Sequence, residues 1–178
     1  FDSQLSALAA NASNAETRAA VADVSKLWRG FRQTARGQVS RDSARVLASR
    51  SEALLQASEA LVRLLERGAG TPQARLINTA GRQRMLSQRM AKLYMLRAWD
   101  IDAASAPGDI DAAGKRFADA LATLRAAPEN TAEIKRELEA VALQWEWFRS
   151  AIELQGAESY ALVVADASES ILNSMDLI

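Results

Sequence analysis

Residue types that carry much of protein chemistry are missing from this sequence. It has no cysteine, which excludes disulfides, thiolate catalysis and cysteine-bound metals. It has no histidine, so the usual general base and the commonest metal ligand are also missing. No nucleophile–base pair or phosphate-cradling glycine loop is visible. We therefore expect no enzyme activity, no catalytic residues, no metal site and no cofactor.

Long apolar runs, prolines and aromatic residues are also scarce. No segment approaches the roughly 18 apolar residues of a membrane span. Only 3 of 178 residues are proline and only 6% are aromatic, while Ala, Leu, Glu, Arg and Ser dominate. These residues favour helix, and no convincing run alternates β-branched residues as a strand would. The composition therefore predicts an all-α protein.

Apolar spacing and breaking residues divide the chain into helices. We expect Ser40 or Asp42 to cap a helix that ends near Arg67. We also expect Gly37 to end a helix and residues 106–108 to form a turn. The expected helices are 1–9, 14–37, the helix capped near residue 40, 72–102, 109–126, 130–154 and 157–178. Short loops between them predict up-down antiparallel four-helix bundles.

The sequence also contains an internal repeat. A shift of 117 residues aligns Val21 with Leu138, Val24 with Val141, Trp28 with Trp145, Phe31 with Phe148 and Ser51-Glu52 with Ser168-Glu169. A shift of 116 aligns Phe1, Leu5 and Leu8 with Phe117, Leu121 and Leu124. A period of this length corresponds to a whole domain. We expect two bundles in tandem, an incomplete one over residues 1–70 and a complete one over residues 71–178.

The first copy lacks a counterpart of the helix at 72–102. That counterpart would lie before Phe1, so we expect the chain to be a fragment of a longer protein. Our hypothesis is that the intact protein carries a second such helix upstream. The recurring Trp-x-x-Phe pairs of the two copies are expected to be core anchors.

Positive charge is concentrated in one segment. Residues 67–99 contain seven Lys or Arg and no acid, although the whole chain has 22 residues of each sign. Such a segment is often a solvated helix face, but it also suits an anionic partner. Nucleic acid is a poor candidate because the chain is neutral overall, with a pI near 6.6. A small anion is the better expectation.

A helical wheel of this segment separates three faces. The expected core face holds Leu76, Ala80, Met90, Tyr94 and Ala98, and the opposite face holds Asn78, Arg82, Met85 and Arg89. Gly81, Arg84 and Gln88 form a stripe between them. Ala80, Arg84, Ser87 and Ala91 also lie near one line, and the small side chains there would let a second helix approach closely, with Arg84 in the seam. Two facing guanidinium groups would suit a small planar oxyanion, because each offers forked donors.

The string from Ile77 to Lys92, INTAGRQRMLSQRMAK, resembles the signature of PilJ-like sensor domains of type IV pilus chemoreceptors. It is also similar to the P-box of nitrate/nitrite sensor kinases, in which Ile-Asn-x-Ala-Gly precedes an Arg-Met pair. That resemblance implies that Arg84 and Gly81 flank a ligand at a dimer axis. Asn78 and Arg89 match other motif positions. The neighbouring Arg82-Gln83 and Leu86-Ser87-Gln88 fit the PilJ-like branch.

The resemblance implies a sensor domain outside the cytoplasm, in the periplasm. It would bind a small nitrate- or nitrite-like anion and act in chemotaxis or signal transduction. The candidate ligand-binding residues are Arg84, Gly81, Asn78, Arg82, Gln88 and Arg89. Two arginine helices would pair in a homodimer or within one chain. The parent is either a membrane chemoreceptor or kinase, or an exported tandem-repeat protein that signals to another receptor.

The alternative function needs no ligand. In that case the helices form a protein-interaction module of a type IV pilus or chemoreceptor system, and the small-residue stripe is only a helix–helix contact. Replacing Arg84 distinguishes the two, because only a sensor should then lose its anion response.

Overall fold

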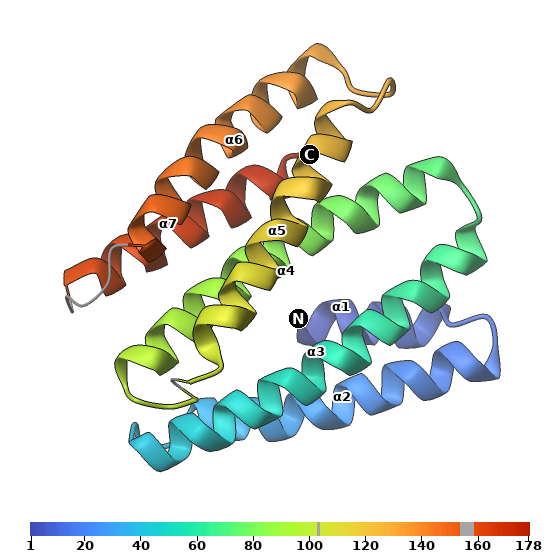
Figure 1. The fold of residues 1–178 in the computed structure, drawn as a ribbon. Helices are drawn as coiled ribbons and strands as arrows, with labels where there is room; N and C mark the ends of the chain where they lie inside the picture. The colour runs from blue at the N-terminus through green and yellow to red at the C-terminus, as the bar shows by residue number, and fades with distance from the viewer. Residues whose placement is uncertain (103, 154–158) are drawn as a thin grey trace. The chain divides into compact units, whose positions relative to one another are not determined.

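The computed structural model describes residues 1–102, 104–153 and 159–178. Within them the chain forms seven α-helices and no strand, which confirms the all-α prediction. The helices are α1 (Asp2–Asn11), α2 (Ala15–Ala35), α3 (Arg41–Ala69), α4 (Pro72–Ala98), α5 (Ala106–Arg125), α6 (Ala132–Glu153) and α7 (Ser159–Asp176) (Figure 1). None of the described helices has the length and apolar character needed to cross a membrane.

Internal contacts divide the chain into two compact units. Unit 1 comprises residues 1–74 and unit 2 comprises residues 75–178, so the boundary lies near the start of α4. Unit 1 contains α1 to α3. Unit 2 contains nearly all of α4 together with α5, α6 and α7.

The ends of the helices in unit 1 follow their capping residues. The Asn14 side chain accepts a hydrogen bond of 2.7 Å from the Thr17 backbone N–H at the start of α2. Ser40, and not Asp42, caps α3 through a reciprocal capping box with Ser43. At the other end, Gly70 adopts φ +63° and its N–H binds the Glu66 carbonyl. A left-handed residue of this kind ends a helix at low cost only when it is glycine.

Two expected boundaries around α4 and α5 are wrong. Helix α4 ends at Ala98 and does not reach residue 102, because the backbone becomes left-handed at Asp100 and Asp102. The expected turn at 106–108 is instead the first turn of α5. Pro107 is tolerated there because the first helical N–H groups need no intrahelical acceptor.

Unit 1 is built on the antiparallel pair of α2 and α3, which lie side by side (Figure 1). Its buried core consists of Leu5, Val21, Val24 and Leu61. Trp28 packs against this core and lies between two rings: it stacks on Phe31 at a centroid distance of 5.7 Å, and the tilted ring of Phe1 lies 4.7 Å away. These contacts hold the start of α1 on α2.

Asp2 adds a polar tie between the same helices. Its carboxylate accepts a 2.8 Å hydrogen bond from the Trp28 indole and forms an ion pair with Arg32. The Trp28 hydrogen bond, followed by the charge of Arg32, lowers the pKa of Asp2 below its ordinary value. A lowered folded-state pKa stabilises the fold above the unfolded pKa, and this contribution disappears as the pH falls through the folded pKa.

We therefore expect Asp2→Ala to lower the melting temperature of the chain at neutral pH. The difference from wild type should shrink once the pH falls below about 4, where an aspartate begins to be protonated even without its partners. Thermal unfolding of both proteins at pH 7 and at progressively lower pH checks this. An equal difference throughout that range would contradict the assigned role.

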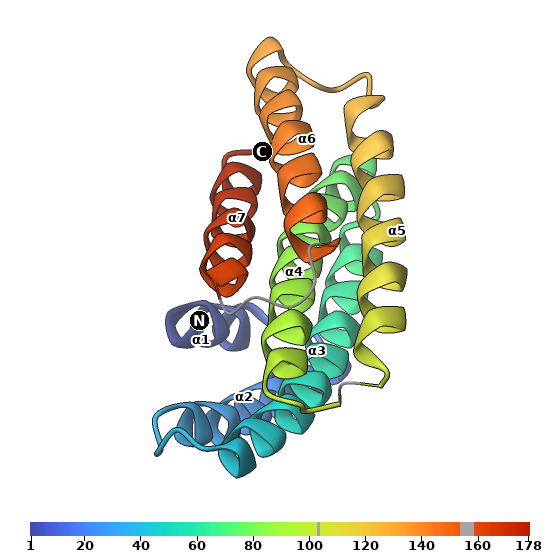
Figure 2. The same ribbon diagram turned by 60° about the vertical axis from the view of Figure 1, so that its left-hand side comes forward.

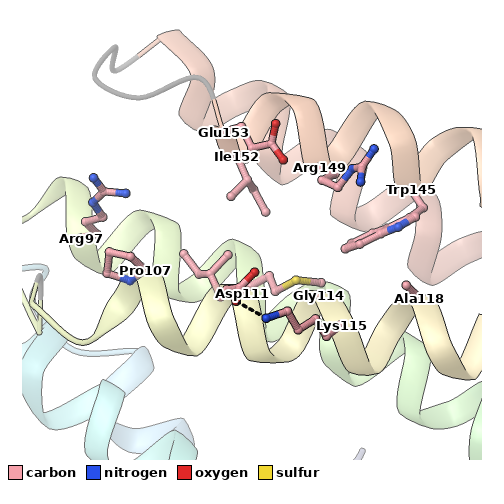
Figure 3. A pocket seen from close by; sticks show the side chains of 12 residues that line it. Arg97, Pro107, Asp111, Gly114, Lys115, Ala118, Trp145, Arg149, Ile152 and Glu153 are labelled. Carbon is pink, nitrogen blue, oxygen red and sulfur yellow. Dashed lines mark ion pairs between the residues drawn. The ribbon is translucent and has the colours of Figure 1, made fainter.

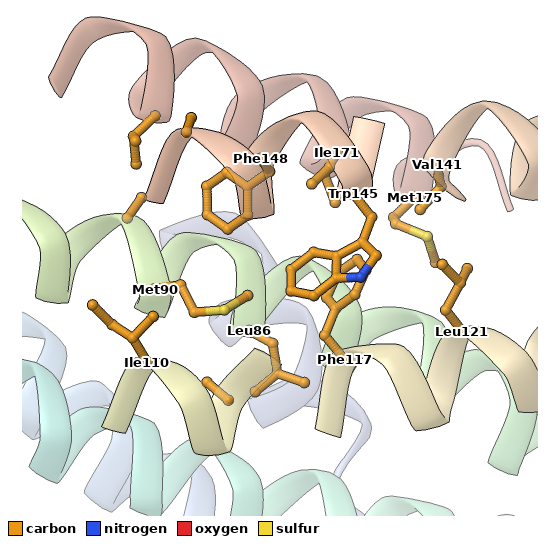
Figure 4. Close-up of a cluster of buried hydrophobic side chains, with 14 of the residues drawn as sticks. Leu86, Met90, Ile110, Phe117, Leu121, Val141, Trp145, Phe148, Ile171 and Met175 are labelled. Atoms are coloured by element: carbon orange, nitrogen blue, oxygen red, sulfur yellow. The ribbon is translucent and has the colours of Figure 1, made fainter. Parts of the chain in front are cut away.

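Unit 2 is a four-helix bundle in which successive helices run in opposite directions (Figures 1 and 2). All four helices contribute to one core (Figure 4). Its largest fully buried side chains include Leu86 and Met90 of α4, Phe117 of α5, Phe148 of α6 and Ile171 of α7. The predicted antiparallel bundle is thus present in this unit.

The core of unit 2 also contains an aromatic trio. Trp145 stacks on Phe117, with a centroid distance of 4.4 Å, and lies 6.0 Å from Phe148. This is the same set of neighbours that Trp28 has in unit 1, where Phe1 and Phe31 take the corresponding places. A second parallel involves serine: Ser51 Oγ donates to the Ala48 carbonyl and Ser168 Oγ to the Ala165 carbonyl, each at 2.8 Å.

Candidate functional site

Helix α4 carries the arginine-rich segment. The burial of its side chains shows which face of the helix packs in the core and which face is open to a ligand. Ala80, Met90 and Tyr94 are buried as the helical wheel predicts, whereas Leu76 is only half-buried and Ala98 is exposed. Gln83, Leu86, Ser87, Ala91 and Leu93 are also buried. The true core stripe is therefore wider than expected and centred near Gln83. It includes the small residues Ala80, Ser87 and Ala91, so the expectation that they admit a second helix from outside is wrong: they already pack inside the bundle of unit 2.

Arg84 contacts α7 at the edge of this stripe. Its Nη1 lies 2.6 Å from Oδ1 of Asp176, the last residue of α7, and the two side chains are 41% and 47% exposed. An ion pair so open to solvent adds at most about 1 kcal/mol to stability. Asp176 therefore orients the Arg84 guanidinium but binds it only weakly.

The other two residues of the stripe surround Arg84. Gln88, one turn further along α4, donates from Nε2 to Ser168 Oγ of α7 at 3.3 Å. Gly81 is exposed, and a Cβ built on it would meet no other atom within 4 Å. Within unit 2 the stripe thus borders α7 on one side and leaves open space at Gly81. The structure brings Arg84 and Gln88 to the same neighbouring helix.

The remaining candidates lie on another face of α4. Arg82 is exposed, and Asn78 and Arg89 are half-buried. Met85 was expected opposite the core together with them, but it packs against the core cluster.

Arg84 retains unused hydrogen-bonding capacity. Its Nε is buried and makes no hydrogen bond to any described residue. A buried donor without an acceptor is uncommon in native proteins, and water or a bound ion usually supplies the missing partner. The site can thus accept one further small acceptor beside the Asp176 carboxylate.

Two contributors to this region have little or no signal in the sequence. Gln83 is fully buried, and its Nε2 donates a 2.8 Å hydrogen bond to the Phe117 carbonyl of α5. Gln83 lies on the same side of the helix as the buried Ala80 and Met90, which could have indicated that it is buried too. A polar side chain, however, is usually expected at the surface. Asp176 is separated from Arg84 by almost the entire unit, so no local spacing reveals that they pair.

Comparison with known proteins identifies the family. Residues 71–169 match the family model for PilJ, described as type IV pili methyl-accepting chemotaxis transducer N-term. No curated protein matches the chain, and no solved structure matches it either. The family contains sensory domains of chemotaxis and pilus transducers and is not an enzyme family. The match covers more than half of the 178 residues. The chain therefore belongs to the PilJ family of type IV pilus chemotaxis transducer N-terminal domains.

Proposed function

We propose that this chain is a periplasmic sensor domain that binds a small planar oxyanion, such as nitrate or nitrite, at Arg84. The single observation that carries the proposal is the state of Arg84. Its guanidinium is half-exposed, has a buried Nε without an acceptor, and lies in a helix rich in positive charge. An oxyanion with acceptors in one plane matches the forked donors of arginine.

Asp176 makes the site switchable. Its Oδ1 lies 2.6 Å from Nη1 of Arg84, so the carboxylate already uses one of the donors of the guanidinium. A bound anion would compete with this carboxylate, because both are acceptors for the same positive charge. Since Asp176 ends α7, exchange of the acceptor would alter how α7 is held against α4. A ligand shifts such an equilibrium only through its different affinity for the two states.

We propose further that two arginine helices pair around the anion. Gly81 has open space beside it, so a second helix can approach α4 closely there. The second helix would come from another copy of the chain or from an upstream repeat. The matching surroundings of Trp28 and Trp145 support a tandem repeat of domains over residues 1–70 and 71–178.

Isothermal titration of the chain with nitrate and nitrite tests the proposed ligand. We expect saturable binding of at least one of these anions, and no saturable binding of chloride under the same conditions. Sedimentation equilibrium with and without the anion tests pairing between chains. If neither anion binds, the sensor proposal for Arg84 is wrong.

Removing the competing carboxylate should strengthen binding. We expect Asp176→Asn to lower the dissociation constant for nitrate by up to about fivefold, because an exposed ion pair contributes at most about 1 kcal/mol. The gain should diminish at high ionic strength. Titration of both proteins at low and high salt measures it. Weaker nitrate binding by the variant would show that Asp176 supports the site and does not compete with it.

A protein-interaction module is the second candidate, favoured by the exposed side of α6. Leu143 and Trp147 are 68% and 76% exposed and line a shallow cavity with Ala167 of α7. Neighbouring exposed apolar side chains of this size often mark protein interfaces. This function predicts that Trp147→Ala, and not Arg84→Ala, abolishes pilus-dependent motility of cells carrying the intact protein.

A further inference from the structure

A separate cavity lies in unit 2, away from Arg84. It has a volume of about 430 Å³ and lies between α5 and α6, with α4 at its base (Figure 3). This volume is within the range of pockets that hold small organic ligands. Neither Arg84 nor any other candidate residue of the arginine helix lines it.

The base of the cavity is apolar. Met90, Ile110 and Trp145 line it and are each buried, so they form a fixed surface. Ile152 of α6 adds a half-buried side chain to the lining (Figure 3). An apolar ligand body placed here would be removed from water without any polar group being left unsatisfied.

Two small residues of α5 create the space. A Cβ on Gly114 would lie 3.4 Å from Cη2 of Trp145, so the glycine allows the indole ring to lie close to the α5 backbone. One turn further, Ala118 is exposed and also lines the cavity. A larger side chain at Ala118 would enter the cavity from the solvent side.

The rim of the cavity is charged. It holds three basic residues, Arg97, Lys115 and Arg149, against two acids, Asp111 and Glu153. Asp111 is neutralised by Lys115, whose Nζ lies 2.9 Å away (Figure 3). This hydrogen bond raises the pKa of Lys115, so the amine stays protonated. Arg149 pairs at 2.6 Å with Glu146, an exposed residue of the same helix that does not line the cavity.

We propose that this cavity binds a small organic acid with an apolar body, in which the body packs on Trp145 and Met90 and the carboxylate pairs with Arg149. An inorganic anion would gain nothing from the apolar base. An uncharged apolar ligand would gain nothing from the charged rim. A carboxylate can share the Arg149 guanidinium, which offers five donors in a planar fork. The proposal does not depend on anion binding at Arg84.

Three compounds with the same ring and different head groups test the proposal. Isothermal titration of the intact chain with phenylacetate, 2-phenylethanol and 2-phenylethylamine should give an affinity up to about fivefold higher for the acid than for the alcohol or the amine, since an exposed ion pair contributes at most about 1 kcal/mol. Indole-3-acetate and 4-methylpentanoate extend the acid series to a larger and to an aliphatic body. Equal affinities for the three head groups, or no binding of any acid at millimolar concentration, would overturn the proposal.

Matched variants locate the site. Ala118→Leu should abolish binding of phenylacetate by filling the cavity, whereas Ala112→Leu, at another exposed position of α5, should leave it unchanged. Arg149→Gln should weaken binding by up to about fivefold, as expected for loss of an exposed ion pair. Arg125→Gln, which removes an exposed arginine outside the cavity, should not. Arg84→Gln should also bind phenylacetate like wild type. Circular dichroism checks that each variant is folded, and wild-type binding by both Ala118→Leu and Arg149→Gln would refute the location.

Discussion

Replacing Arg84 with glutamine should eliminate the stabilisation of the chain by nitrate or nitrite. An anion present at 100 times its dissociation constant raises the free energy of unfolding of wild type by about 2.7 kcal/mol, and the variant should gain none of this. Without ligand, the variant should lose no more than about 1 kcal/mol, because the ion pair with Asp176 is nearly half-exposed. Thermal unfolding of both proteins with and without the anion measures the two effects.

Arg125 provides the matched control for this variant. It also belongs to unit 2, and its guanidinium forms an interhelical ion pair with Glu139 at 2.7 Å, with similar exposure. Arg125→Gln should therefore keep the full response to nitrate. If Arg84→Gln responds to the anion as wild type does, the anion binds elsewhere and the assignment of the site is wrong.

Replacing Phe148 with alanine should destabilise unit 2 by about 3–5 kcal/mol, the usual range for removing a large buried aromatic side chain. Phe148 is fully buried and packs in the core shared by α4, α5, α6 and α7 (Figure 4). Its neighbour Trp147 is 76% exposed. Trp147→Ala should therefore change the stability by no more than about 0.5 kcal/mol.

Urea unfolding followed by circular dichroism measures both aromatic variants. The comparison is demanding because the two residues are adjacent in α6 and similar in size and apolar character. Equal losses for the two variants would contradict the packing of unit 2, since α6 would then not present Phe148 to the core.

Much of the fold follows from local sequence. Residues with high helix propensity, few prolines and a clear capping residue such as Ser40 are sufficient to predict the all-α class and the position of α3. The error at residues 106–108 has a local cause: a proline is compatible both with a turn and with the first turn of a helix. The left-handed backbone of Asp100 and Asp102 is harder to predict, because aspartate adopts positive φ more often than most residues other than glycine but still does so in only a minority of cases.

The candidate site was less accessible to sequence reasoning. The spacing of Gly81, Arg84 and Gln88 predicts that they share one side of α4, but it cannot show that Arg84 and Gln88 contact α7. Those contacts depend on the packing of the whole bundle. The cavity lined by Trp145 also depends on the packing of the whole bundle. It arises where Gly114 and Ala118 of α5 lie opposite Trp145 of α6.

The central claim is that Arg84 belongs to a site for a small planar oxyanion. Its most direct test is thermal unfolding of wild-type protein in nitrate, nitrite, sulfate and chloride at equal ionic strength, which removes differences in general charge screening. We predict selective stabilisation by nitrate or nitrite, approaching about 2.7 kcal/mol at 100 times the dissociation constant. Equal unfolding curves in all four salts would contradict the claim.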